Sequence, residues 1–182
     1  MVITVLAVLA TIVLIAVNPG EQLARGRDAN RISAVTSVGR SIQRYYSIQG
    51  AYPNSVAASN WMQKIIDLSE LKLPIGNPAY SGSLPSEICN GSRAQNLPAG
   101  LNGSNTYGYC YAVGSSPFDT AIVYVQLESN IYNKKCFSGG TQYRAWAVWA
   151  SAFAKSGLWC STATTNPAAE PTIAGVTSLL SF

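Results

Sequence analysis

The first seventeen residues of the chain are apolar except for two threonines, and none of them is charged. As a helix this run would span about 25 Å, slightly less than the roughly 30 Å hydrocarbon core of a bilayer. No Lys or Arg precedes the run and no small-residue cleavage site follows it, so it differs from a signal peptide. Because the sequence starts abruptly within the run, we expect further apolar residues to precede Met1 in nature.

The apolar run stops at Asn18, Pro19 and Gly20, which predict a break between two helices. Asn18 suits an N-cap, Pro19 suits the first helical position, and Glu21 stands where a capping box carries a carboxylate. Pro19 also disfavours helical backbone at Asn18. We therefore expect a new helix to begin at this point without a spacer.

Helical periodicity continues to about residue 50 in two sections of different character. The first section is a collar of mixed charge with no apolar face, which we expect to need water, lipid headgroups or charged neighbours. The collar consists of Glu21, Arg25, Arg27, Asp28 and Arg31. The second section carries an apolar stripe wide enough to pack on a core. The stripe consists of Ile32, Val35, Val38, Ile42, Tyr45 and Tyr46, and the opposite side carries Ser33, Ser37, Arg40, Ser41 and Arg44.

Residues 54–182 have the pattern of one globular head. A short helix is expected over about 60–72, with Asn60 as its cap and Pro74 beyond its end. A loop rich in Pro, Gly, Ser and Asn follows at about 74–106. Aromatic and β-branched residues then predict three strands of an antiparallel meander, at about 107–113, 120–127 and 143–150.

The uncharged end of the tail could add an edge strand or contact a neighbouring subunit. A long helix followed by a sheet makes the expected fold class α+β.

The composition narrows the chemistry that this chain can perform. Charged residues make up only 11% of the chain, and no histidine is present, which removes the commonest general base and metal ligand. We expect no enzymatic activity, no cofactor and no metal; Asp119 and Glu128 near strand ends do not by themselves make a calcium site. The net charge of +4 gives a nucleic-acid partner only weak support.

Four cysteines, widely spaced and without a CxxC motif, favour two disulfides in an oxidising compartment over a zinc site or free thiols. Three connectivities are open to them. We favour the sequential one, which closes two loops of about twenty residues, each worth roughly 3 kcal/mol in the chain-entropy model. It pairs Cys89 with Cys110 and Cys136 with Cys160.

Two motifs in the first 53 residues resemble the type IV pilin and type II secretion pseudopilin superfamily. The stretch ATIVLIAVNPGEQLARGRDANRIS, residues 10–33, is similar to the helix of bacterial pilins, and residues 45–53 match the pattern YYxxxGxYP that closes it. The family's methylated N-terminal phenylalanine and its glutamate five residues in have no counterpart here, and Val5 is not that glutamate. We expect the corresponding residues to lie upstream of Met1.

The resemblance implies a type IV pilin fold, in which the rear half of a long N-terminal helix packs on an antiparallel sheet head. In such filaments the apolar helices lie at the centre, and the helix often melts near its proline, here Asn18 to Gly20. The residues that would form the filament core are Val2, Val5, Leu6, Leu9, Ile12, Val13 and Ile15.

The function that the resemblance implies is that of a major pilin, a structural subunit of a surface filament serving adhesion, motility or DNA uptake. Its partners would be identical subunits, the inner membrane that it spans once before assembly, the pilus assembly machinery and the prepilin peptidase. One alternative is the major pseudopilin of a type II secretion system. A second, from another class, is a membrane-anchored extracellular binding module.

Overall fold

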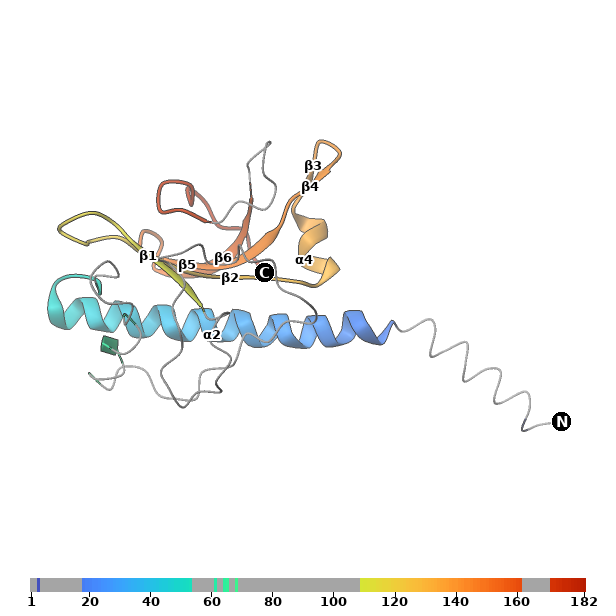
Figure 1. Cartoon of the computed structure of the whole chain (residues 1–182), viewed down its shortest axis with the longest axis horizontal. Helices are drawn as coiled ribbons and strands as arrows, with labels where there is room; N and C mark the ends of the chain where they lie inside the picture. Colours follow the sequence, from blue (N-terminus) through green and yellow to red (C-terminus); the bar gives the residue numbers. More distant parts are fainter. Residues whose placement is uncertain are drawn as a thin grey trace.

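The computed structural model has a long helix that lies against an antiparallel sheet (Figure 1). It describes Ile3, 18–53, Trp61, Lys64, Ile65, Leu68, 109–161 and 171–182. Helix α2, Pro19–Gln49, is followed by strands β1, Cys110–Val113, and β2, Ala121–Gln126. Next come helix α4, Asn130–Lys135, and the short strands β3, Phe137–Ser138, and β4, Thr141–Gln142. Strands β5, Ala145–Ala150, and β6, Lys155–Cys160, complete the order, and the α+β class is confirmed.

Helix α2 begins where the sequence predicts a boundary. Asn18 is its N-cap in left-handed conformation, and the Asn18 side chain accepts a hydrogen bond from the Glu21 N–H at 3.4 Å. Pro19 occupies the first turn and Gly20 is helical. The helix has 31 residues, or about 46 Å at 1.5 Å per residue, and ends at Gly50, whose N–H donates to the Tyr46 carbonyl. The seven residues predicted to form a filament core, from Val2 to Ile15, lie outside the described residues.

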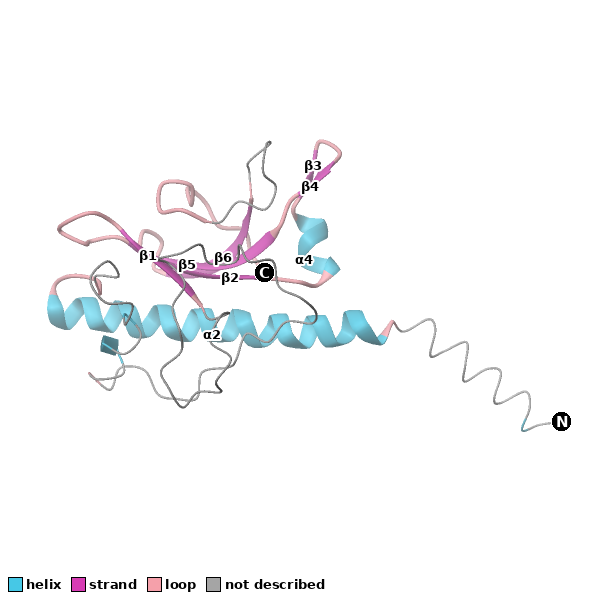
Figure 2. Cartoon of the chain, in the orientation of Figure 1, coloured by secondary structure: helices cyan, strands magenta, loops and turns pink. Residues whose placement is uncertain are grey.

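Strands β1, β2, β5 and β6 form one sheet in that order, and every neighbouring pair is antiparallel (Figure 2). Three of them lie within the segments predicted as strands, whereas β6 was not predicted. The sequence between β2 and β5 was also not assigned, and it forms α4 and the separate β3–β4 hairpin. Gly139 and Gly140 form the hairpin turn, and both have positive φ, which glycine adopts without steric cost.

The core lies between α2 and the sheet. Val35, Val38 and Ile42 of the predicted stripe are fully buried there, and Ile32, Tyr45 and Tyr46 pack at its margin. Gly39 lies directly against the Trp149 indole, so close that an added Cβ would stand 2.1 Å from the ring. The stripe is therefore wider than predicted, because it also includes Ala34 and Gly39.

Ser41 was assigned to the solvent side of the helix, and this assignment was wrong. Its side chain is buried, and its hydroxyl donates a hydrogen bond to the Ser37 carbonyl one turn earlier. Such a bond satisfies the hydroxyl within the helix, so burial leaves no lost hydrogen bond.

The opposite face of the sheet carries a second apolar cluster, which includes Tyr124, Trp146 and Trp159. Residues 171–182 cover part of it, and Leu180 forms a single antiparallel bridge with Leu158 of β6. Within residues 171–182 the β-type backbone pairing with the sheet edge is thus limited to one residue pair, which is less than the edge strand suggested by the sequence.

Two aromatic side chains of the head stack on each other in the core. Trp61 and Tyr111 are fully buried and stack with ring centroids 4.7 Å apart, and the Tyr111 hydroxyl donates to the Pro53 carbonyl. Burial raises the pKa of Tyr111. Trp61, Lys64 and Ile65 are helical, while the rest of the predicted 60–72 helix and the 74–106 loop lie outside the described residues.

Candidate functional site

The charged collar of α2 is the part of the molecule where polar side chains from distant segments meet. It faces the β2–α4 turn, residues 127–129, and the start of α4. Figure 1 places α4 above the end of α2 at which the helix begins. This position brings residues about 100 apart in sequence into hydrogen-bond contact.

Asp28 is the centre of this contact and is fully buried. Its carboxylate accepts hydrogen bonds from the Glu128 N–H at 3.1 Å and from the Ser129 N–H at 2.8 Å. The Arg31 guanidinium donates to the same carboxylate at 2.7 Å. Three donors satisfy the oxygens of this buried carboxylate. The charge of Asp28 is thus compensated inside the protein instead of by water.

Arg31 bridges two carboxylates. It is 1% exposed, and besides Asp28 it donates to Glu128 at 3.2 Å. Glu128 also pairs with Arg27, which is partly exposed. Two carboxylates and two guanidinium groups therefore balance in charge. Removing one member would leave an uncompensated charge in a buried place, which is strongly destabilising.

The collar was expected to lack an apolar face and to need water, lipid headgroups or charged neighbours, and the head supplies charged neighbours. Asp28 and Arg31 point into the head and pack there through ion pairs, and only part of the collar meets solvent. The expectation that the collar needs charged neighbours is therefore confirmed. Their identity was missed, because nothing in the sequence around Glu128 marks it as a partner of residues 27 and 31.

Glu21 makes a second, more exposed connection in the first turn of α2. Its carboxylate accepts a hydrogen bond from the Asn130 N–H at 3.2 Å and from Arg25 at 3.3 Å. Desolvation acts to raise the pKa of Glu21, but the backbone hydrogen bonds from Asn130 and Ile131 and the Arg25 charge outweigh it and lower the pKa. Glu21 thus binds α4 in its charged form.

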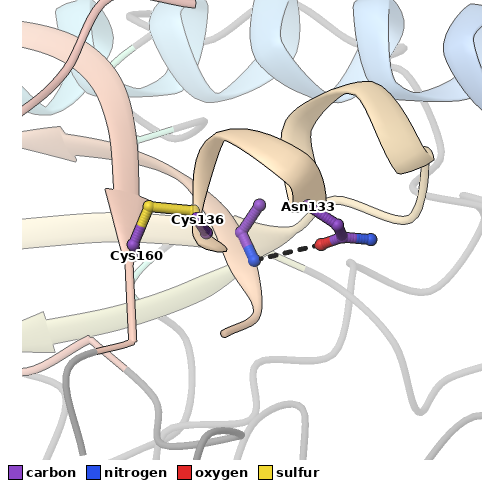
Figure 3. Close-up of a disulfide and its surroundings, with 4 residues drawn as sticks. Asn133, Cys136 and Cys160 are labelled. Atoms are coloured by element: carbon purple, nitrogen blue, oxygen red, sulfur yellow. Dashed lines mark hydrogen bonds between the residues drawn. A yellow bond between two sulfur atoms is a disulfide. The ribbon is translucent and has the colours of Figure 1, made fainter. Parts of the chain in front are cut away.

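The predicted disulfide between Cys136 and Cys160 is present, and it joins the end of α4 to the end of β6 (Figure 3). Beside it the Asn133 side chain accepts a hydrogen bond from the Ala145 N–H at 3.3 Å (Figure 3). Cys110, buried in β1, is also disulfide-bonded, and its predicted partner Cys89 lies outside the described residues.

Asp119 and Glu128 do not come together, because they flank opposite ends of β2. Within the described part of the chain, no group of three or more Cys, Asp or Glu side chains could hold a metal ion. Glu128 is engaged by arginines, as described above.

The side of α2 next to β6 carries an open groove of about 410 Å³. Hydroxyl groups and two arginines line it, and the Thr36 hydroxyl lies 2.7 Å from that of Ser156 in β6. The lining residues are Ser33, Thr36, Ser37, Arg40 and Arg44. The described residues that line the groove include neither Asp nor Glu.

Among the residues with described placement, none belongs to a helix long and apolar enough to cross a membrane. Comparison with protein-family models, with curated proteins and with solved structures found no match for the chain. In the described structure, a long helix is thus attached to a disulfide-bonded head at two places, by an apolar stripe and by an ion cluster.

Proposed function

We propose that this protein is a structural subunit, a major pilin, which polymerises through its apolar N-terminal segment into an extracellular type IV pilus filament. One observation carries the proposal. Helix α2 contacts the head along most of its length, from Glu21 to Tyr46, and it begins at Pro19, one residue after the uncharged run of residues 1–17.

Such a connection suits a subunit whose apolar segment must hold the head at a defined place in a polymer. A membrane-anchored binding module needs only a tether, and a flexible linker serves that purpose. Here the chain passes from the apolar run into a capped helix within three residues, Asn18 to Gly20. The ion cluster also fixes the orientation of α2 relative to the head, because hydrogen bonds between charged groups depend on geometry.

Two further features support the proposal. The sequence of residues 10–33 and 45–53 resembles type IV pilins. The Cys136–Cys160 disulfide is typical of a protein that works in an oxidising compartment outside the cytosol. The polar groove on α2 offers a lateral surface on which the head of a neighbouring subunit would lie.

The first experiment is to shear filaments from the surface of the native cells and to determine the N-terminal sequence and intact mass of the sheared protein. An N-methylated residue upstream of Met1, and a mass four hydrogens low for two disulfides, would support a processed pilin. A product that starts after Val17, or one that keeps Met1 as a free start, would contradict it.

A matched pair of variants then tests polymerisation itself. We expect Ile12→Asp to abolish surface filaments, because a charge in the apolar core of a helical polymer is costly, while Ile12→Val leaves them intact. Electron microscopy and immunoblotting of the sheared fraction provide the measurement. Normal filaments from Ile12→Asp would contradict the proposal. Loss of exoprotein secretion without surface filaments in the deletion strain would assign the chain to a secretion pseudopilus.

A further inference from the structure

Helix α4 and the hairpin after it have little to stabilise them on their own. The helix has six residues, all of them described, and each side chain is exposed or half-buried. Isolated helices shorter than about 12 residues are marginal in water. Strands β3 and β4 have two residues each and pair only with each other in the described sheet topology. The segment therefore depends on contacts with other elements.

The N-terminal end of α4 lacks a cap of its own. Its N-cap residue, Ser129, makes no side-chain capping hydrogen bond, and its hydroxyl finds no partner among the described residues. The first N–H groups of a helix need acceptors from elsewhere when the N-cap side chain does not supply them.

Helix α2 supplies these acceptors. Glu21 accepts from the N–H of Asn130, the first residue of α4, and Asp28 accepts from the N–H of the N-cap Ser129 and from that of Glu128 just before it. The two carboxylates are seven residues apart, which is about two turns and places them on the same face of α2. Negative charge at a helix N-terminus is also stabilising through the helix dipole. One helix thus caps another that follows it by about 100 residues.

The other end of α4 is attached to the sheet and does not involve α2. Cys136, its C-cap, is bonded to Cys160 of β6, and the Asn133 side chain accepts from the Ala145 N–H. The segment is therefore fixed covalently to the head at one end and by hydrogen bonds to α2 at the other. Tyr132 in the middle of α4 also packs against the core and edge to face with Phe182. The attachment to α2 contains no covalent bond, so it can open while the disulfide keeps the other end in place.

From this asymmetry we propose that α4 and the β3–β4 hairpin form a conformational switch, which is ordered while the collar of α2 is docked and loosens when the collar leaves the head. The inference rests on the contacts within one chain and does not require the proposed filament function. The segment presents Ile131, Lys134, Lys135 and the 59% exposed Phe137 to solvent, so the order of this surface would follow the position of α2.

The coupling has a direct test in hydrogen exchange of the full chain in detergent micelles. We expect Glu21→Ala to raise the exchange rates of the Ile131–Lys135 amides at least tenfold, with the amides of β5 unchanged. Arg25→Ala is the matched control, because it removes the ion pair with Glu21 and leaves the bond to Asn130 in place. Its α4 amides should exchange as in the unchanged protein.

A stronger variant, Asp28→Ala, should raise α4 exchange further than Glu21→Ala does, and Asp119→Ala, which alters an exposed carboxylate at the other end of β2, should leave it unchanged. Unchanged α4 protection in Glu21→Ala would overturn the switch. Equal acceleration of α4 and β5 in Glu21→Ala would also overturn it, because α4 would then open only when the whole head unfolds. If Asp28→Ala unfolds the head, the comparison of Glu21→Ala with Arg25→Ala still decides between these outcomes.

Discussion

The front and rear parts of α2 bind the same head by different physical means. The rear part, residues 32–49, buries Val35, Val38 and Ile42 against the sheet. The front part, residues 19–31, places a buried carboxylate and guanidinium against Glu128 and the start of α4. Apolar burial is nondirectional and scales with the area removed from water. Buried ion pairs contribute little net stability, but moving one charge away from its partner is strongly destabilising because it leaves an uncompensated buried charge.

The difference suggests a division of tasks along one helix. The stripe supplies most of the free energy that holds α2 on the sheet, and the ion cluster fixes where along the sheet the helix lies. A shift of α2 by one turn would still bury apolar surface, whereas it would separate Asp28 from the N–H groups of Glu128 and Ser129 and Arg31 from the Glu128 carboxylate. The following four variant sets test this division, from the largest expected effect to the smallest.

Removal of one charge from the cluster should have the largest effect. We expect Asp28→Ala to lower the free energy of unfolding by about 4 kcal/mol, because Arg31 and two backbone N–H groups lose their buried partner. The double variant Asp28→Leu with Arg31→Met should recover only part of this loss, since it removes the uncompensated Arg31 charge but leaves the N–H groups of Glu128 and Ser129 without their acceptor. Denaturant unfolding of the full chain in detergent measures both. A loss below about 1 kcal/mol in Asp28→Ala would contradict this account of the cluster.

Truncation within the stripe should have a smaller but still large effect. Ile42→Ala is expected to cost about 3 kcal/mol, because it removes buried methylene groups and leaves a cavity. Ile48→Ala, at a site 58% exposed on the same helix, is the control and should change stability by less than about 0.5 kcal/mol. Equal effects at both positions would mean that the stripe does not dominate the attachment.

Two helical glycines make the next comparison. Gly39→Ala should destabilise by about 2 kcal/mol, because its Cβ would overlap the Trp149 ring, which is part of the core. Gly26→Ala should instead stabilise by about 0.5 to 1 kcal/mol, since its Cβ would meet no described atom within 4 Å and alanine favours a helix. Thermal unfolding compares the two. Stabilisation by both substitutions would show that Trp149 can move away from the helix.

The smallest expected effect concerns pH at the exposed end of the cluster. The pKa of Glu21 is lowered in the folded protein, so its carboxylate stabilises the fold above the ordinary value of 4.5, and this contribution is lost as the pH falls through the lowered value. We expect the amide resonance of Asn130 to shift over this acidic range. The same resonance in Glu21→Gln should lack this titration. A midpoint above 4.5 would contradict the direction of the shift.

The sequence predicted those parts of the fold that depend on local pattern. The cap at Asn18, the buried positions Val35, Val38 and Ile42, and the positions of β2 and β5 all follow from periodicity and residue type. The rear stripe is visible because every fourth or third residue repeats the same property. The Cys136–Cys160 disulfide was predicted correctly because we favoured the connectivity with the shortest loops.

The elements that were missed depend on partners far away in sequence. Helix α4, NIYNKK, has no apolar stripe, and its N-terminal caps come from Glu21 and Asp28. Strand β6, KSGLWC, begins with Lys, Ser and Gly, and becomes a strand because it pairs along its whole length with β5. The burial of Arg31 had no local signal either, since it requires Glu128, 97 residues later.

The bond between Cys136 and Cys160 has a mechanical consequence. It closes a loop across a separation of 24 residues, which contains β3, β4, β5 and most of β6. Tension applied between the two ends of the chain passes through the disulfide and bypasses this loop. At about 3.4 Å per residue, the oxidised chain pulled straight is shorter by roughly 80 Å than the reduced chain. Under load, the contacts of α2 with the head would therefore yield while the loop that contains the β5–β6 pair stays closed.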